Sequence, residues 1–378
     1  MLTASERHDA MALIRQRERT QQRCITMGLA GLLGLLLLPA TNSWAQTVPA
    51  DLVDVSIEQL FDANVISESE RDNESKRWHV SYRFARSTFD EYYLGTRSLT
   101  YDDVLWEPTE VRTRNNYPVV PTKITQSVQA LLVGYDYSDS LTLRLSLPYV
   151  RQSSDHISIV PGYDDFNISS SGIGDTVVLA DYVLHRSINS LLRAHVGVSV
   201  PTGSIDEQGD TPRAPGNQQL PYTMQMGSGT WDFPLAIAYE KYENAYRWGL
   251  DARATWRSGD NDRDYRLGHK VRVGGWLSTR VNPWLEPGVG FNYRWQGKIS
   301  GEDAELSVPN PQFPYPAPVA DPNDFGGEQL DLSVFVQLRL NESGSYARIE
   351  YSNPVYLDLN GPQSAQNEQV QFSIGTAF

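Results

Sequence analysis

Charged side chains recur at alternate positions within apolar segments of this chain, and that spacing places them on one face of a strand. Arg247, Asp251 and Arg253, for example, alternate with Trp248 and Leu250. A charge taken out of bulk water needs a partner or bound water. This face therefore forms a salt-bridge network that fills an interior, or it lines a conduit whose mild excess of arginine steers anionic or aromatic solutes. The candidates for lining such a lumen are Arg83, Arg144, Asp181, Arg193, His195, Arg247, Asp251, Arg253, Arg272, Glu286, Arg294, Asp331, Arg339, Arg348 and Glu350.

Catalysis is a weaker interpretation of the same residues. None of the histidines after residue 45 lies in a recognisable nucleophile motif, and the chain contains no Gly-x-Ser-x-Gly. A lipase would need a Ser–His pair, and a barrel protease would need acids and histidine near the outer rim. We expect no enzyme activity and assign no catalytic residue.

Metal and thiol chemistry are also unsupported by the sequence. Asp260, Asp262 and Asp264 have the alternate-acid spacing of a calcium loop, but glycine at the sixth position and glutamate at the twelfth are missing. A solvated loop is expected there, with no metal and no cofactor. The one cysteine, Cys24, lies in the leader described below, so a mature chain has no disulfide, thiolate ligand or cysteine nucleophile.

The elements that carry these charges are predicted to be strands. The alternation is cleanest in residues 141–149, where four leucines and Tyr149 face one way. About twelve such segments of roughly 9–11 residues occur, enough to cross a bilayer at a tilt. Long and short connections alternate between them. The long polar stretches predicted to be loops are Ser87–Thr122, Arg151–Gly172, Thr202–Met226, Ser258–Arg266 and Gly297–Gly327.

The last segment, Glu368–Phe378, alternates in the same way and ends the chain on an aromatic residue. Such a terminus resembles the closing strand of bacterial outer-membrane β-barrels, where the aromatic is part of the assembly signal. We therefore expect Phe378 to be that signal. The strand should pair with the segments at Tyr346–Tyr351 and Trp78–Phe84, so that no sheet edge faces lipid.

Composition separates a membrane barrel from its alternatives. The net charge of −14 argues against a nucleic-acid partner, and the mean hydropathy of −0.43 argues against a helical membrane bundle. A soluble β-sandwich would bury its largest rings in mid-strand. Here aromatic residues lie near strand ends on the apolar face, as in the girdles of membrane barrels. They are Trp78, Tyr149, Tyr246, Trp256, Trp295 and Tyr351.

The N-terminal part divides into a leader and a short segment. Arginines precede an apolar run at Met27–Ala40, and Ser43-Trp-Ala45 follows it, which predicts a signal peptide over residues 1–45. Residues 46–77 then form a periplasmic or plug segment, in which Ser56 is a possible N-cap of a short helix. A leader that docks only loosely is an open alternative. The barrel is expected over residues 78–378.

Three glycine-containing runs and the C-terminal Phe378 support a family resemblance. The runs are Ser171-Gly-Ile-Gly-Asp175, Val198-Ser-Val-Pro-Thr-Gly-Ser204 and Met226-Gly-Ser-Gly-Thr-Trp-Asp232. Glycine at such points permits tight bends and close backbone approach at a barrel rim. Together they resemble the MetA-pathway of phenol degradation family of outer-membrane transporters. The resemblance implies a barrel and the passage of small, aromatic or hydrophobic compounds.

The sequence thus predicts an all-β, antiparallel up-and-down transmembrane barrel of about twelve strands. Its expected function is an outer-membrane channel or transporter for small solutes. The alternatives are a structural or adhesive barrel with a closed lumen and a barrel enzyme such as a lipase or protease. The expected partners are the outer-membrane lipid bilayer, the barrel-assembly machinery and a small-molecule solute, with no nucleic acid.

Overall fold

The computed structural model describes residues 77–341 and 344–378 of the chain. The predicted signal peptide and all but the last residue of the predicted segment 46–77 lie outside these residues. Within the described ranges, no helix has both the length and the apolar character that crossing a membrane requires.

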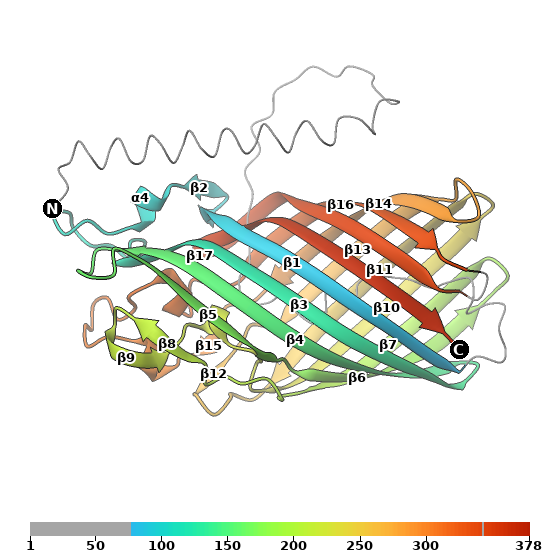
Figure 1. Cartoon of the computed structure of the whole chain (residues 1–378), viewed down its shortest axis with the longest axis horizontal. Coiled ribbons are helices and arrows are strands. Elements are labelled where there is room, and N and C mark those ends of the chain that lie inside the picture. The colour runs from blue at the N-terminus through green and yellow to red at the C-terminus, as the bar shows by residue number, and fades with distance from the viewer. Residues whose placement is uncertain (1–76, 342–343) are drawn as a thin grey trace, which may run out of the picture. The chain divides into compact units, whose positions relative to one another are not determined.

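One closed antiparallel sheet dominates the described part of the chain (Figure 1). Each strand pairs with the next one along the chain, and β17 pairs with β1 to complete the ring. The strands of the ring are β1 (Trp78–Gly95), β3 (Val119–Ser138), β4 (Leu141–Ser158), β6 (Thr176–Arg186), β7 (Ser190–Val200), β10 (Trp231–Glu243), β11 (Tyr246–Ser258), β13 (Lys270–Thr279), β14 (Leu285–Gln296), β16 (Gly327–Arg339) and β17 (Tyr346–Ala377). The predicted up-and-down barrel is confirmed.

The ring contains eleven labelled strands in the described residues, yet an all-antiparallel ring closes only with an even number of crossings. The resolution lies in β17, whose residues 346–359 pair with β16 and whose residues 359–377 pair with β1. Its two halves also contact each other, because Ser345 Oγ lies 2.9 Å from Thr376 Oγ1 and Ser352 Oγ donates to Gln369 Oε1 at 3.4 Å. The chain therefore reverses within β17, and twelve crossings result.

The seam of the barrel joins the first and last strands, as predicted. Tyr82 pairs with Ile374 and Phe84 with Phe372 across β1 and β17. At the rim, the backbone N–H of Phe378 donates to the Trp78 carbonyl at 2.9 Å, and the N–H of Trp78 donates back at 3.1 Å. The first and last strands thus satisfy each other's backbone groups, as a membrane barrel requires.

The outer face of the ring is apolar and the inner face is polar. Leu250 and Val334, on the outer face, are 49% and 57% exposed, whereas Asp251 and Ser333 beside them are 5% exposed. All six predicted girdle residues are exposed. Four of them lie within two residues of a strand end, whereas Tyr149 is in the middle of β4 and Tyr351 is the sixth residue of β17. A soluble sandwich would bury those leucines and valines, so the distribution is that of a barrel with a lipid-facing belt.

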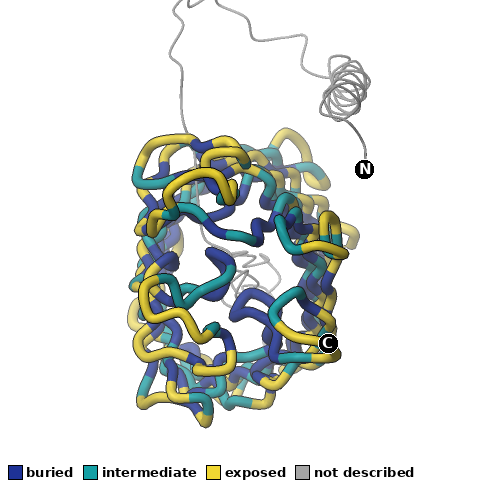
Figure 2. Tube along the Cα trace, turned by 90° about the vertical axis from the view of Figure 1, so that its left-hand side faces the viewer, coloured by how far each residue is buried: buried dark blue, intermediate teal, exposed yellow. Residues whose placement is uncertain are grey.

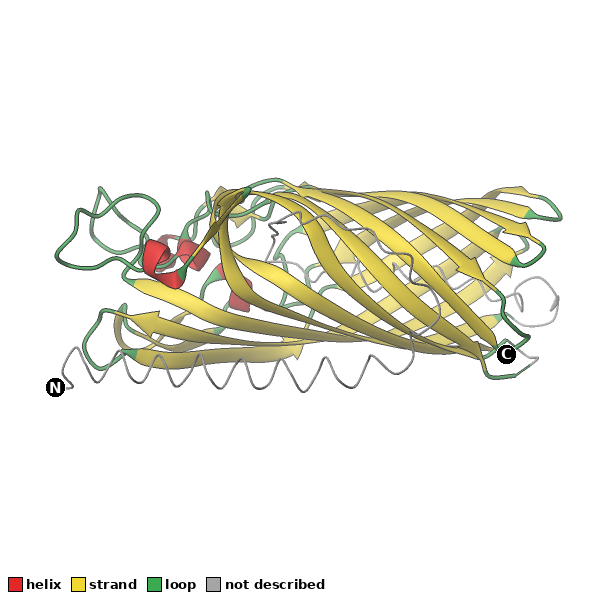
Figure 3. Ribbon diagram, turned by 90° about the horizontal axis from the view of Figure 1, so that it is seen from above, coloured by secondary structure: helices red, strands yellow, loops and turns green. Residues whose placement is uncertain are grey.

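The short turns, the start of β1 and the end of β17 lie at one rim of the barrel, and the long connections lie at the other (Figures 1 and 3). The long connections contain β2 (Arg97–Leu99), α4 (Tyr101–Val104), β5 (Asp165–Ile173), β8 (Gln208–Thr211), β9 (Ala214–Gln219), η1 (Tyr222–Met224), β12 (Tyr265–Arg266), β15 (Ser300–Gly301), η2 (Ala304–Leu306) and η3 (Pro318–Ala320). The two rims are therefore chemically and structurally distinct.

Two of the predicted loops were partly wrong. Residues 87–95 and 119–122 belong to β1 and β3, and most of residues 151–172 belongs to β4 and β5. These stretches pair as antiparallel ladders, for example Ser153 with Ser169. The prediction relied on alternating apolar residues, and beyond the lipid belt both faces of a strand are free to be polar.

Candidate functional site: the barrel lumen and its loop end

A charged triad spans three neighbouring strands of the inner face. Asp181 on β6 contacts Arg144 Nε on β4 and His195 Nδ1 on β7, each at 2.5 Å. Asp181 on β6 is paired with His195 on β7 in the strand register, and both residues are at inward positions of their strands, so their side chains meet. Asp181 is 3% exposed, so the cation is needed to offset the cost of burying its charge.

Five further ion pairs continue around the wall. Each joins an arginine to an acid on the same strand or a nearby one, at distances from 2.6 to 3.0 Å. The pairs are Arg247–Glu286, Arg253–Asp251, Arg257–Asp232, Arg294–Asp331 and Arg348–Glu350. This part of the inner face is a salt-bridge network.

Four predicted lining residues have other surroundings. Arg272 Nε donates to Asn292 Oδ1 at 2.9 Å, and Arg339 lines a cavity near the short turns together with Arg247 and Glu286. Arg193 is half-buried on β7. Arg83 is treated below.

Arg83 lies on the inner face of β1, five residues after Trp78, where this strand begins at the short-turn rim. It is 4% exposed on β1, and its guanidinium interacts electrostatically with those of Arg144 on β4 and Arg253 on β11. In a ring of twelve crossings, β11 lies six strands from β1 and is its opposite wall. Arginines from opposite walls therefore come within electrostatic range of each other, and Arg144 and Arg253 are each also paired with an acid, Asp181 and Asp251.

Two inward-facing aromatic rings also lie against the inner wall of the barrel. Trp276 lies over Gly249, where an added Cβ would meet the Trp276 indole nitrogen at 2.6 Å, and Phe335 lies over Gly288, where it would meet Cζ at 2.2 Å. The Arg348 guanidinium stacks on Phe335, 3.6 Å from the ring centroid. Glycine on the neighbouring strand lets each large ring lie flat instead of projecting into the lumen.

These rings were not among the predicted site residues. Their signal was present, since Trp276 and Phe335 stand at inward positions between small or polar residues. The predicted lining residues were all charged residues or histidine, and aromatic residues were considered only on the apolar face.

The connection between β14 and β16, residues 297–326, turns into the barrel. Ala317 and Val319 join a buried cluster with Phe89, Val128 and other residues on the inner wall of β1 and β3. The N–H of Val119 donates to the Pro316 carbonyl at 3.1 Å. The end-on view of Figure 2 shows buried segments reaching inward from the ring. Part of this connection therefore narrows the lumen.

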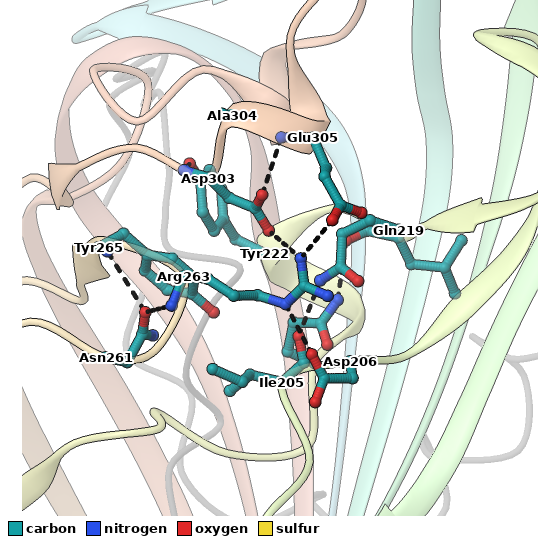
Figure 4. A network of polar contacts seen from close by, with 12 residues as sticks. Ile205, Asp206, Gln219, Tyr222, Asn261, Arg263, Tyr265, Asp303, Ala304 and Glu305 are labelled. Carbon is teal, nitrogen blue, oxygen red and sulfur yellow. Dashed lines mark hydrogen bonds and ion pairs between the residues drawn. The ribbon is translucent and has the colours of Figure 1, made fainter.

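Three of the long connections are joined by a network around Arg263 (Figure 4). Arg263 donates to Asp206 at 2.8 Å and to Asp303 at 3.1 Å, and Asp303 N–H donates to the Tyr222 hydroxyl at 2.9 Å. Rings of Tyr222 and Tyr265 pack with centroids 4.8 Å apart beneath it. The Arg263–Asp206 pair is open to water on its Asp206 side and contributes little alone, whereas Asp303 is buried and needs its cation to offset the loss of water. The aromatic contacts and the Arg263–Asp303 pair together hold this loop cluster.

The aspartates of the predicted solvated loop lie in this region. Asp260, Asp262 and Asp264 are exposed, and the buried Asn261 accepts from the backbone N–H groups of Arg263 and Tyr265. Among the described residues, no group of three or more His, Cys, Asp or Glu is arranged to hold a metal ion.

A buried acid fixes the same inward connection. The Tyr117 hydroxyl donates to Asp324 Oδ2 at 2.5 Å, and Asp321 lies on the other side of that hydroxyl at 3.3 Å. Burial, and then the neighbouring Asp321, raise the pKa of the Asp324 carboxyl to about 8. The carboxyl is held as the neutral acid at neutral pH.

The three glycine-containing runs of the sequence meet at one point. Asp175 accepts hydrogen bonds from Gly203 N–H at 2.9 Å and from Ser228 N–H at 2.8 Å. An added Cβ on Gly203 would lie 2.7 Å from the Gly227 backbone, and one on Gly227 would lie 2.4 Å from Asp175 Oδ1. The glycines are thus needed for the close approach of three connections, beyond the rim bends expected from sequence.

A solved structure with a similar fold is an outer-membrane channel, and two further channels or transporters match more distantly. The COG4313 outer membrane channel from Pseudomonas putida F1 is 19% identical, with a TM-score of 0.54, over 80% of this chain and 96% of that one. The TodX monoaromatic hydrocarbon channel is 8% identical over 83% and 94%, with a TM-score of 0.43. The Ralstonia pickettii toluene transporter TbuX is 10% identical over 80% and 90%, with a TM-score of 0.37. None of the curated proteins matches this chain.

A family model provides the sequence-level match. It covers residues 118–306, which include all three glycine runs and the Arg263 loop, and it is described as the MetA-pathway of phenol degradation. That range is half of the 378 residues. The chain therefore belongs to the MetA-pathway of phenol degradation family.

Proposed function

We propose that the protein is an outer-membrane channel for small solutes. The observation that supports this most strongly is the group of arginines at Arg83, Arg144 and Arg253, which stand inside a closed barrel whose outer face is apolar. With their partners Asp181 and Asp251, these arginines bring three guanidinium groups and two carboxylates together inside the barrel. A barrel that served only as a scaffold would not need charged groups there, because burying each one costs free energy. Positive charge in a conduit lowers the barrier for anions. Residence in the outer membrane and insertion by the barrel-assembly machinery belong to the same proposal.

The lining favours anionic or aromatic solutes. Guanidinium groups pair with carboxylates and also stack on aromatic faces. Arg348 on Phe335 is an internal example of the second contact. The similar TodX and TbuX structures are named as a monoaromatic hydrocarbon channel and a toluene transporter, and a small aromatic solute for this chain is consistent with its family.

Single-channel recording in a planar bilayer under a potassium chloride gradient tests the proposal. We expect discrete openings and a reversal potential that shows preference for chloride. Changing Arg83→Gln and Arg253→Gln together should move the reversal potential toward the value for a non-selective pore, because two fixed charges leave the narrow region.

The matched control is Arg86→Gln. Arg86 is on the same strand but on the outer face, where it is exposed. It should leave selectivity unchanged. A lumen that never conducts would instead favour the structural barrel, and an equal effect of the inner and outer changes would refute a role for the arginine group. Hydrolysis of lipid or protein by the purified barrel would favour the enzyme. The residues to test first would then be His195 and its acid partner Asp181.

A further inference from the structure

The outer face of β1 and β4 changes from apolar to basic on the way from the short turns to the loop rim. On β1 the last apolar outward residue is Phe84, and the next outward residue is Arg86. On β4 the change falls between Tyr149 and Arg151. Both arginines are exposed. On this wall the lipid-facing belt therefore ends directly beside two cations, where lipid headgroups begin.

The two arginines belong to one row of the sheet. Arg86 is paired with Ser127 on β3, and Ser127 is paired with Arg151 on β4. Arg151 is paired in turn with Ser171 on β5, and both side chains donate to the Tyr149 hydroxyl oxygen. Neighbouring strands lie about 4.8 Å apart, so the α-carbons of the two arginines are separated by roughly 10 Å. Long guanidinium side chains at that spacing reach the same phosphorylated headgroup.

Beyond this row, the same face is polar and rich in hydroxyl groups. Its outward residues on β3, β4 and β5 are half-buried or exposed, and they include Lys123, Thr125, Ser153, Asn167 and Ser169. Hydroxyl, amide and cationic groups are the hydrogen-bond partners of sugars and phosphates. The antiparallel sheet displays these groups side by side, as an extended surface next to the lipid belt.

The cations of this surface are not all neutralised by the chain itself. Within residues 77–341 and 344–378, neither Arg86 nor Lys123 makes an ion pair. Asp155, which is paired with Lys123 in the register, accepts instead from Asn167 at 2.8 Å. Glu368 on β17 is exposed two register positions farther toward the loop rim than Arg86. In a chain with 46 acidic and 32 basic residues, exposed cations without a carboxylate favour an anion from outside the chain.

The side of the membrane identifies that anion. In outer-membrane barrels the short turns face the periplasm and the long loops face the exterior, so the loop-side end of the belt lies in the outer leaflet. The lipid of that leaflet is a glycolipid that carries phosphates on its sugar headgroup.

We propose that Arg86, Arg151 and Lys123, with the hydroxyl groups between them, bind the phosphorylated sugar headgroup of this glycolipid, lipopolysaccharide. Basic residues at a membrane surface attract anionic headgroups in this way. The proposal depends on the proposed outer-membrane location of the barrel, and it does not depend on whether the lumen conducts.

Binding of fluorescent lipopolysaccharide to the folded barrel in an uncharged detergent tests the contact. Arg86→Gln combined with Arg151→Gln should weaken binding roughly 30-fold, because each basic residue beside an anionic headgroup contributes about fivefold in affinity. Lys123→Gln should weaken it further. Higher salt should weaken binding to the unchanged protein and reduce the difference between the proteins.

The matched control is Arg77→Gln combined with Arg186→Gln, which removes the same charge. These arginines are also exposed, but they lie at the short-turn rim, before β1 and at the end of β6. The control should bind lipopolysaccharide almost as well as the unchanged protein. All four side chains are exposed, so both double variants should keep the heat-modifiable barrel. Equal weakening in the two double variants would mean unspecific attraction, and it would overturn the site.

Two further ligands identify what is bound. Lipopolysaccharide without its phosphates should bind the unchanged protein about as weakly as intact lipopolysaccharide binds the Arg86–Arg151 variant. Inorganic phosphate should compete no better than chloride at the same ionic strength. Equal binding of the dephosphorylated glycolipid overturns the phosphate contact, and full competition by inorganic phosphate overturns the glycolipid as the ligand.

Failure of this proposal is distinguishable from failure of the channel. The planar bilayers of the conductance test contain no lipopolysaccharide, so Arg86 has no headgroup partner in that test. A barrel that binds the glycolipid through this row but never conducts refutes the channel alone. A conducting barrel whose two double variants bind equally refutes the glycolipid site alone.

Discussion

Removing the charge of Asp181 tests whether the lumen network stabilises the barrel. Asp181→Asn keeps the size of the side chain and its contact with His195, but leaves the Arg144 guanidinium without its carboxylate. Breaking a fully buried ion pair costs about 3–5 kcal/mol. The Arg144 side chain is 27% exposed, so water offsets part of this, and we expect a loss of about 2–3 kcal/mol, roughly a 30- to 150-fold change in the unfolding equilibrium.

The assay is urea unfolding of the barrel in lipid vesicles, followed by tryptophan fluorescence, with the dependence on urea compared between variants. The double variant Arg144→Met with Asp181→Asn removes both charges and should recover most of the loss. Arg86→Gln, on the outer face, should change little. The reasoning fails if Asp181→Asn costs less than about 1 kcal/mol, or if the double variant is less stable than the single one by the full cost of Arg144→Met.

Three further predictions concern the loops and the seam. The pKa of the Asp324 carboxyl is raised to about 8 in the folded barrel, so its neutral form contributes stability that is complete below pH 3.8 and is lost as pH rises through about 8. Limited proteolysis of the β14–β16 connection should therefore become faster between pH 6 and pH 9. Asp324→Asn should abolish this pH dependence. Gly203→Ala places a Cβ within 2.7 Å of the Gly227 backbone, so the yield of heat-modifiable barrel on gels should fall. The control is Gly216→Ala, which adds only the strain of a positive φ, because an added Cβ there meets nothing within 4 Å. Deletion of Phe378 removes the backbone pair with Trp78 and the expected assembly signal. The amount of folded barrel in the outer membrane should therefore fall more than the amount of protein synthesised. Normal assembly of the deletion variant would contradict the role of Phe378 as the assembly signal.

Much of the wall was predictable from local sequence. Side chains alternate along a strand regardless of what lies around it, so Leu141 to Tyr149 identified β4 and its outward face before any pairing was known. The terminal strand and its pairing with β1 followed from the same alternation together with the requirement that no edge remain in lipid. The charged inner positions were predicted in the same way, since each falls between two lipid-facing residues.

The contacts between residues distant in the sequence depend on the tertiary structure. Arg83 and Arg253 approach because closure of the ring brings β1 opposite β11, and no local pattern contains the curvature of that ring. Asp175 joins Gly203 and Ser228 because three connections cross at the rim, and the inward turn of residues 297–326 depends on apolar partners on β1 and β3. The sequence by itself determined which residues face lipid and which face inward, because that depends on each strand alone. Which inward residues meet depends on register and closure, and these are properties of the whole barrel.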